Sequence, residues 1–291
     1  MESNKNAKII SWLNIGLVVA FFSILLIVGT FKDLDIASQI YNKGNAFGKI
    51  FEAIGKLPGY IILGVGFAIL FNCAITKKDA KVISKVALGA VYCVGGLVSG
   101  ALLALDLAEM LLTGAKVYFV AGVIGLGVFS LEFCSLNVKR NVDWTKYRKF
   151  AFSAIFAVLA ILIVCAGLKI VCGRLRYEQI LAGEGAFANW YSFQRAGGSS
   201  LPSGHMAMAC AGYLLLPLCK KNVSKIVVDV ATMAFAIVVL ISRMSIGAHF
   251  LSDVAIAGIV SFVICMVANR LSFGADNDRL EFGEKNFLAK L

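Results

Sequence analysis

Two apolar runs near the end of the chain are joined by a short polar stretch that reads SRMSIGAHFLSD over residues 242–253. This stretch places an arginine, a histidine and an aspartate beside segments that are otherwise hydrocarbon. Such side chains are costly to bury unless they pair or take part in chemistry. His249 and Asp253 are four residues apart, so in a helix they would share one face, with the carboxylate within reach of the imidazole. A histidine oriented by a carboxylate is a recurrent part of nucleophilic active sites.

The composition indicates a membrane protein. Of the 291 residues, 59% are hydrophobic and 15% are charged, and the mean hydropathy is +0.84. Soluble domains have about 45–50% apolar and about 25% charged residues. A soluble all-helical protein is the alternative, but several runs reach the ~20 apolar residues that span a bilayer. The eight cysteines lie in or beside these runs without a C-x-x-C pair, which favours small buried side chains over disulfides or metal ligands.

The apolar runs predict an all-α, polytopic membrane bundle of six to eight transmembrane helices. Eight runs are visible, at residues 9–31, 57–75, 86–105, 117–136, 150–171, 205–219, 225–242 and 250–270. The first is longer than the apolar core of a signal peptide, so we interpret it as a retained span. The sixth is short for a span, and the polar residues 106–109 mark either a loop or a polar spot inside the bundle.

The loop expected between residues 32 and 56 contains apolar side chains at helical spacing. Phe47, Ile50, Phe51 and Ile54 share one face, with charged residues between them. This pattern predicts a short amphipathic helix, which either lies in the membrane interface or simply connects two spans.

The basic residues predict the orientation of the bundle. The net charge of +11 arises from short clusters between apolar runs, such as those at 77–85 and 139–149, and this is a topology pattern rather than a nucleic-acid-binding patch. With the N-terminus inside, most of the 28 basic residues fall in inside segments. The positive-inside rule therefore predicts both termini in the cytoplasm and puts residues 172–204 and 243–249 on the outer face.

A second polar motif, LPSGH, opens the run at 205–219. Proline and serine are typical of helix starts, where unpaired backbone N–H groups and the positive end of the dipole bind phosphate. Gly204 would let the backbone approach a ligand closely, and His205 would lie in the first turn. The chain has only two histidines, and both lie in these motifs.

Three cations, Lys169, Arg174 and Arg176, crowd the outer end of the run at 150–171. Alone, they fit an anchor that extends to lipid headgroups. Together with Arg243 and a helix start, they suit a phosphate group, whose oxygens accept several charged hydrogen bonds. The loop before LPSGH carries Arg195 and several aromatic residues that either cover this site or rest at the interface. These aromatic residues are Phe187, Trp190, Tyr191 and Phe193.

The three stretches resemble the signature of the type 2 phosphatidic acid phosphatase superfamily, which reads K-x6-R-P, then P-S-G-H, then S-R-x5-H-x3-D. Lys169 and Arg176 match the first part, residues 202–205 match the second in full, and residues 242–253 match the third at both spacings. Tyr177 stands where the family usually has proline, a departure that concerns the geometry of the loop. The resemblance covers residues 169–253.

The resemblance implies roles for the site residues. His249 would be the nucleophile that forms a phospho-histidine, with Asp253 holding its other ring nitrogen. His205 would be the general acid that protonates the leaving oxygen and later activates water. The phosphoryl oxygens would be held by Lys169, Arg176, Ser203, Gly204 and Arg243. The cations would take the place of a metal ion, so no metal or other cofactor is expected, and for Arg174 a supporting role and a headgroup contact both stay open.

The resemblance also implies a domain organisation around a six-helix phosphatase core. We expect N-terminal transmembrane helices without a catalytic motif at 1–149, the catalytic core at 150–270 and a cytoplasmic tail at 271–291. The expected location is the plasma or inner membrane, with the site facing the outside or the periplasm.

The function expected from these features is a metal-independent membrane lipid phosphatase. Its substrate would be a lipid phosphomonoester or diphosphate, of the undecaprenyl diphosphate, phosphatidylglycerol phosphate, phosphatidic acid or lipid A class. The expected partners are this substrate and membrane lipids, not nucleic acid, and the sequence does not indicate an oligomeric state. The alternatives are a lipid phosphotransferase that uses the same intermediate and an anion transporter or channel.

Overall fold

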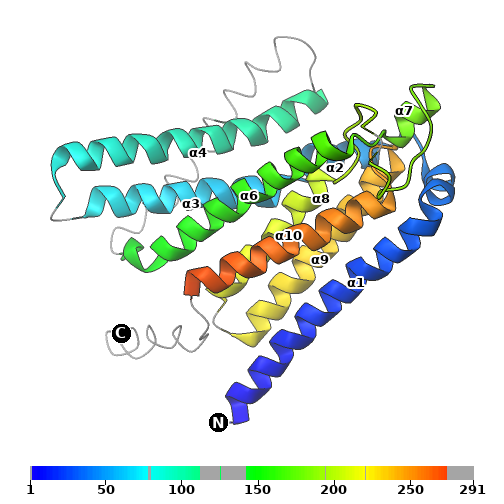
Figure 1. Cartoon of the computed structure of the whole chain (residues 1–291). Helices are drawn as coiled ribbons and strands as arrows, with labels where there is room; N and C mark the ends of the chain where they lie inside the picture. The colour runs from blue at the N-terminus through cyan, green and yellow to red at the C-terminus, as the bar shows by residue number, and fades with distance from the viewer. Residues whose placement is uncertain are drawn as a thin grey trace.

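The computed structural model describes residues 2–77, 80–111, 125, 142–193, 195–219 and 221–273. Within these ranges the chain forms helices and no strand. The elements are α1 (Glu2–Ile40), α2 (Ala46–Ile54), α3 (Leu57–Thr76), α4 (Val82–Leu111), the 3₁₀ helix η1 (Trp144–Tyr147), α6 (Arg148–Cys172), α7 (Tyr177–Leu181), α8 (Gly204–Ala209), the 3₁₀ helix η2 (Cys210–Leu218), α9 (Asn222–Ser245) and α10 (Leu251–Phe273). Figure 1 shows the long helices side by side in one bundle.

Six helical segments in the described part are long and apolar enough to cross a membrane. They are Ile15–Ile40, Ala46–Thr76, Val82–Asp106, Trp144–Leu181, Asn222–Ser245 and Leu251–Ser272. The expected all-α polytopic bundle is therefore confirmed, and the chain fits a multi-pass membrane protein.

Several details differ from the expectation. The run at 205–219 forms α8 and η2, which are too short together to count as a span. The loop expected from residue 32 begins later, because α1 continues to Ile40, and α2 occupies Ala46–Ile54. Residues 106–109 lie inside α4, where Asp106 forms an ion pair with Lys56 at 2.8 Å. The run at 117–136 falls outside the described residues apart from Gly125.

The core of the bundle depends on small side chains along α6 and α10. Ala151, Ala154 and Ala157 of α6 are buried, whereas Phe156 and Ile163 on the same helix are exposed. Because lipid tails are as apolar as leucine, helices in a membrane gain most from close contact of small residues, while bulky ones face the lipid. α6 accordingly packs closely against both α3 and α10.

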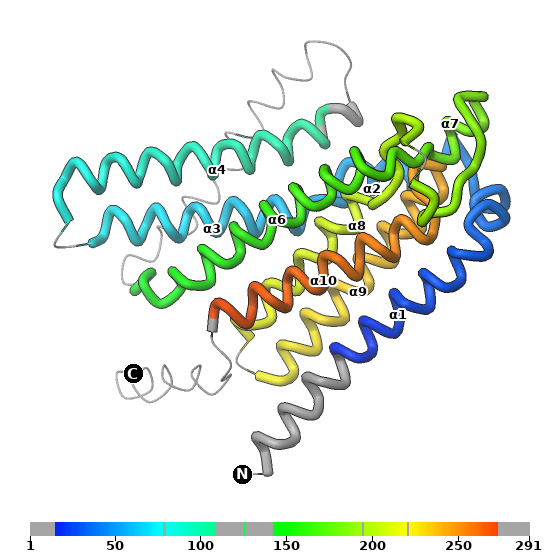
Figure 2. Tube along the Cα trace, viewed as in Figure 1, coloured from blue at the N-terminus to red at the C-terminus, as the bar shows by residue number. Residues whose placement is uncertain are grey.

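This packing brings distant parts of the sequence to one end of the bundle. In Figure 1, α1 and α6 end near α7, where α10 begins, whereas α1 starts and α10 ends toward the opposite side of the bundle. Figure 2 traces the long loop that leads from α7 back toward α8 across this end. All three sequence motifs lie here, so the fold gathers them at one end of the bundle.

We expect Ala257→Leu to destabilise the bundle, because Ala257 of α10 is fully buried in the core and a larger side chain overpacks it. Overpacking typically costs about 1–3 kcal/mol. Thermal unfolding in detergent would measure the loss. The control is Val263→Leu on the same helix, since Val263 is exposed. Equal midpoints for the two variants would contradict this account of the core.

Candidate active site

The end of α6 sets the direction of the first motif. Gly173 ends the helix in the left-handed conformation with φ 55°, and its N–H donates to the Lys169 carbonyl at 2.9 Å. A Cβ at this position would lie 2.6 Å from the Cα of Arg195, so both the conformation and the space favour glycine. Beyond this turn, Arg174 enters the bundle and Arg176 remains partly exposed.

The nucleophile expected from the sequence lies in the tight turn between α9 and α10. The N–H groups of Ala248 and His249 both donate to the carbonyl of Arg243, at 3.1 Å and 3.3 Å. The His249 side chain is buried. Because α10 begins only at Leu251, His249 precedes this helix.

One ring nitrogen of His249 has a defined partner. Nδ1 lies 2.5 Å from the carbonyl oxygen of Ser200. A carbonyl can only accept, so Nδ1 carries the proton and Nε2 keeps its lone pair. Burial is the main cause that lowers the pKa of the His249 imidazole well below its usual value, and the positive charges of Arg243 and Lys169 add to it. His249 is therefore neutral near pH 7, as a nucleophile must be.

His249 and Asp253 do not form the hydrogen bond with each other that the sequence predicted. Asp253 Oδ2 accepts from the Ser200 hydroxyl at 2.5 Å and from the Phe250 N–H at 2.8 Å. The expectation assumed that His249 and Asp253 share a helix, but Asp253 lies in the first turn of α10, where its carboxylate caps Phe250. The carbonyl of Ser200 takes the place expected for Asp253, and Asp253 is linked to His249 through Ser200 and through the backbone of Phe250.

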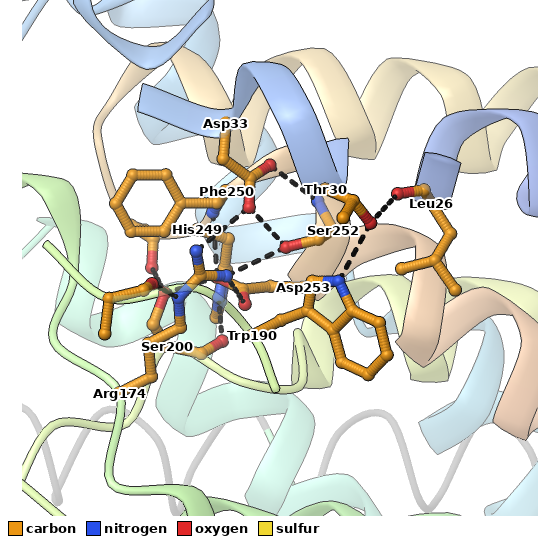
Figure 3. A network of polar contacts seen from close by, with 12 residues as sticks. Leu26, Thr30, Asp33, Arg174, Trp190, Ser200, His249, Phe250, Ser252 and Asp253 are labelled. Carbon is orange, nitrogen blue, oxygen red and sulfur yellow. Dashed lines mark hydrogen bonds and ion pairs between the residues drawn. The ribbon is translucent and has the colours of Figure 1, made fainter. Parts of the chain in front are cut away.

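Arg174 is the centre of a buried polar network. Its side chain is 3% exposed, which excludes the headgroup contact, and it pairs with Asp253 at 2.6 Å and with Asp33 of α1 at 2.9 Å. It also donates to the Ser252 hydroxyl and the Ala188 carbonyl. Figure 3 shows these groups converging from α1, α10 and the loops. Arg174 is thus an internal tie between elements.

Aromatic side chains of the 182–203 loop cover this network in part. Phe187 packs edge-on against Phe250, and the Arg174 guanidinium lies over both rings. Trp190 donates its indole N–H to the Thr30 hydroxyl of α1 at 3.0 Å. Tyr191 and Phe193, in contrast, are about half exposed. Phe187 and Trp190 therefore cover the network in part, as one of the two possibilities expected, and a position of Tyr191 and Phe193 at the membrane interface stays a prediction.

The second motif begins α8. Ser203 is the N-cap, and its hydroxyl accepts from the Met206 N–H at 3.5 Å. No atom lies within 4 Å of the position that a Cβ of Gly204 would take, so open space adjoins the start of this helix. His205 Nε2 lies 2.8 Å from the carbonyl oxygen of Glu52 on α2.

The remaining cations repel one another. Lys169 lies close enough to Arg176, Arg243 and Lys56 for their charges to interact, and within the described part of the chain its ammonium group has no hydrogen-bonding or acidic partner. Arg243 is buried and contacts Glu52 Oε1 at 3.1 and 3.2 Å. Arg176 contacts Glu178 and Ser199 at longer distances of 3.3 and 3.2 Å.

Several donors of these arginines are buried without a hydrogen-bond partner among the described residues. They are Nε of Arg176 and both Nε and Nη1 of Arg243, although Nη1 lies within ion-pair distance of Glu52 Oε1, at 3.1 Å. Buried donors left unpaired are costly, and charged ones more so. An anion with several oxygens would satisfy them. In the described part of the chain, no three His, Cys, Asp or Glu side chains form a group that could hold a metal ion.

Comparison with known families finds one similarity, in the segment that carries the three motifs. The model of the PAP2 superfamily matches residues 150–276. This segment of the chain is therefore similar to the PAP2 superfamily. The match includes all three motifs, and this similarity supports a phosphatase-type activity. Neither a curated protein nor a solved structure matches the chain significantly.

Sequence reasoning missed three residues that complete the candidate site. Asp33 and Glu52 come from α1 and α2, before the PAP2 match, and Ser200 lies just ahead of the second motif. Asp33 could have been noticed, because it is an acidic residue directly after an apolar run. No local pattern distinguishes Glu52 or Ser200.

We expect Glu52→Gln to strengthen binding of inorganic phosphate, because the Glu52 carboxylate competes with an anion for Arg243. A loss of about 1 kcal/mol of competition corresponds to roughly fivefold tighter binding. Calorimetric titration of the detergent-solubilised protein with phosphate would measure it. Asp35→Asn is the control, since this exposed carboxylate pairs only with Lys32 in the described structure. Unchanged or weaker binding by Glu52→Gln would contradict this assignment.

Proposed function

We propose that the protein is an integral-membrane lipid phosphatase that works through a phospho-histidine on His249. The observation that carries the proposal is the group of buried arginine donors, without hydrogen-bond partners among the described residues, beside two histidines. Lys169, Arg176 and Arg243 supply more positive charge than the nearby carboxylates balance. A phosphoryl group brings the oxygens and the charge that this group lacks.

In the proposed first step, Nε2 of His249 attacks phosphorus. A P–N bond forms as the P–O bond to the lipid breaks, and the imidazole becomes positively charged. The Ser200 carbonyl at 2.5 Å holds the Nδ1 proton in place and stabilises this charge, as the carboxylate does in a catalytic triad. The buried Asp253 adds negative charge behind Ser200.

His205 is the proposed general acid and base. The Glu52 carbonyl takes one ring N–H and leaves the other ring nitrogen free to exchange protons. When His205 is in its protonated imidazolium form, which the negative charge of the bound phosphate would stabilise, this nitrogen gives its proton to the leaving lipid oxygen. It then takes a proton from the water that attacks phosphorus, which breaks the P–N bond and releases phosphate.

The cations stabilise the transferring group. Phosphoryl transfer passes through a loose transition state whose charge is spread over three oxygens, so positioning and electrostatics provide most of the catalysis. Lys169, Arg176 and Arg243 are the proposed ligands of these oxygens, with Ser203 and the Gly204 N–H at the start of α8. Arg243 would exchange Glu52 for substrate when the phosphate enters.

We further propose that the substrate is a lipid phosphomonoester or diphosphate in the outer leaflet. The support is the positive-inside count, which favours cytoplasmic termini and a site on the outer or periplasmic face. Undecaprenyl diphosphate, phosphatidylglycerol phosphate, phosphatidic acid and lipid A phosphate all carry the required group. The catalytic core would be residues 150–270.

Phosphate release from a panel of these purified lipids in detergent tests the proposal. We expect wild-type protein to release phosphate with no acceptor added, because water resolves the intermediate. His249→Ala and His205→Ala should lose activity by about 10²-fold or more while eluting as folded protein, since each removes a group that acts in the transition state.

Full activity of folded His249→Ala would contradict the proposed mechanism. Release that requires an added alcohol or second lipid would favour the phosphotransferase. Anion flux into liposomes that survives His249→Ala would favour a transporter.

A further inference from the structure

α1 lies outside the segment that matches the PAP2 superfamily, yet its Asp33 enters the polar network beside His249. The Asp33 side chain is 3% exposed, as is that of its partner Arg174. Oδ1 accepts from the Ser252 N–H at 2.9 Å, and Oδ2 accepts from Arg174 Nη2 at 2.9 Å and from the Ser252 hydroxyl. Figure 3 shows Asp33 above Arg174 and beside the first turn of α10.

Asp33 caps the start of α10 from another helix. Ser252 is the second residue of α10, and the first N–H groups of a helix have no partner within it. A carboxylate there satisfies a donor and places negative charge at the positive end of the helix dipole. Because His249 lies two residues before the start of α10, an anchor on the first turn of α10 also limits the movement of His249.

A continuous series of buried contacts leads from Asp33 to the nucleophile. Arg174 joins Asp33 to Asp253, Asp253 accepts from the Ser200 hydroxyl at 2.5 Å, and the Ser200 carbonyl accepts from His249. Each carboxylate accepts three hydrogen bonds within this network. One guanidinium is thus shared between a carboxylate of α1 and a carboxylate of α10.

We propose that Asp33 is a positioning residue for His249, so that α1 completes the catalytic site of the PAP2 segment. This inference rests on the proposed phosphatase function. Without the Asp33 carboxylate, Arg174 turns wholly toward Asp253 and competes with the Ser200 hydroxyl for its oxygens. The Ser200 carbonyl then holds the His249 ring less firmly, while the phosphate-binding cations stay in place.

The approach of α1 to α10 offers a second way to disturb the same contact. A Cβ on Gly29 would lie 2.6 Å from the backbone nitrogen of Ser252 and 2.9 Å from Asp33 Oδ1. Gly29→Ala therefore pushes the two helices apart without changing any charge. Gly16→Ala is the matched control on α1, because no atom lies within 4 Å of its added Cβ.

The experiment measures kcat and KM of the full chain in detergent for wild type and the variants Asp33→Asn, Gly29→Ala and Gly16→Ala. We expect kcat to fall by about 10- to 100-fold in the first two, the range known for residues that orient metal-binding histidines. KM should change by less than about threefold, since the phosphate ligands are untouched. Gly16→Ala should behave as wild type.

A pH profile of kcat/KM separates positioning from a general loss of folded protein. The charged groups that face His249 are Lys169 of α6, Arg176 after it, His205 of α8 and Arg243 of α9, with Asp253 of α10 behind Ser200. All remain in Asp33→Asn, which removes one negative charge from the network. Protonated His249 is then less stabilised, so the acid limb moves to lower pH. Partial unfolding lowers the amplitude and leaves the limb in place.

An active wild type with unchanged kcat and pH profile in Asp33→Asn would overturn the assignment and leave the phosphatase function intact. If Asp33→Asn fails to fold, Gly29→Ala decides, and wild-type kcat in that variant overturns the assignment as well. If the wild-type protein releases no phosphate from any lipid of the panel, this result overturns both the proposed function and the positioning role of Asp33 that rests on it.

Discussion

The buried charge of Arg174 is the constraint on which the candidate site depends. Its partners Asp33 and Asp253 come from α1 and α10, and its Nε donates to the 182–203 loop. Removing one partner of a buried ion pair typically costs about 3–5 kcal/mol, because the other charge stays behind uncompensated. The guanidinium is therefore stable only when these helices and the loop lie together. The same contacts hold Ser200 and, through it, His249, so formation of the site is coupled to assembly of the bundle.

The cations of the site divide into two kinds, and the division carries the functional argument. The Arg174 guanidinium finds its hydrogen-bond and charge partners within the protein, so its role is structural. Lys169, Arg176 and Arg243 repel one another and leave donors unpaired among the described residues. Sequence position did not separate these kinds, since Arg174 and Arg176 are two residues apart. The turn at Gly173, where α6 ends, separates the two kinds. Beyond this turn, the side chain of Arg174 points into the bundle, whereas that of Arg176 stays at the site.

The sequence predicted the helical class, most of the spans and the gathering of the motifs, because apolar runs of span length and ionisable groups beside them have few alternative explanations in a membrane. The predictions failed where contacts between distant parts of the chain determine the geometry of the site. The spacing of His249 and Asp253 predicted a direct hydrogen bond, but the start of α10 at Leu251 leaves His249 outside the helix. Asp33 and Glu52 precede the motifs by more than a hundred residues, and only the packing of α1 and α2 brings them to the site.

The central claim is that His249 takes the phosphoryl group covalently, and rapid-quench labelling tests it most directly. Wild-type protein would be mixed with a lipid phosphate labelled in the phosphoryl group and quenched in alkaline denaturant, which preserves phospho-histidine, and the labelled peptide would then be identified. The account predicts a label on His249 that forms and decays within one turnover and is absent from His249→Ala. Phosphate release in a single turnover with no covalent label, or with the label on another residue, would contradict it.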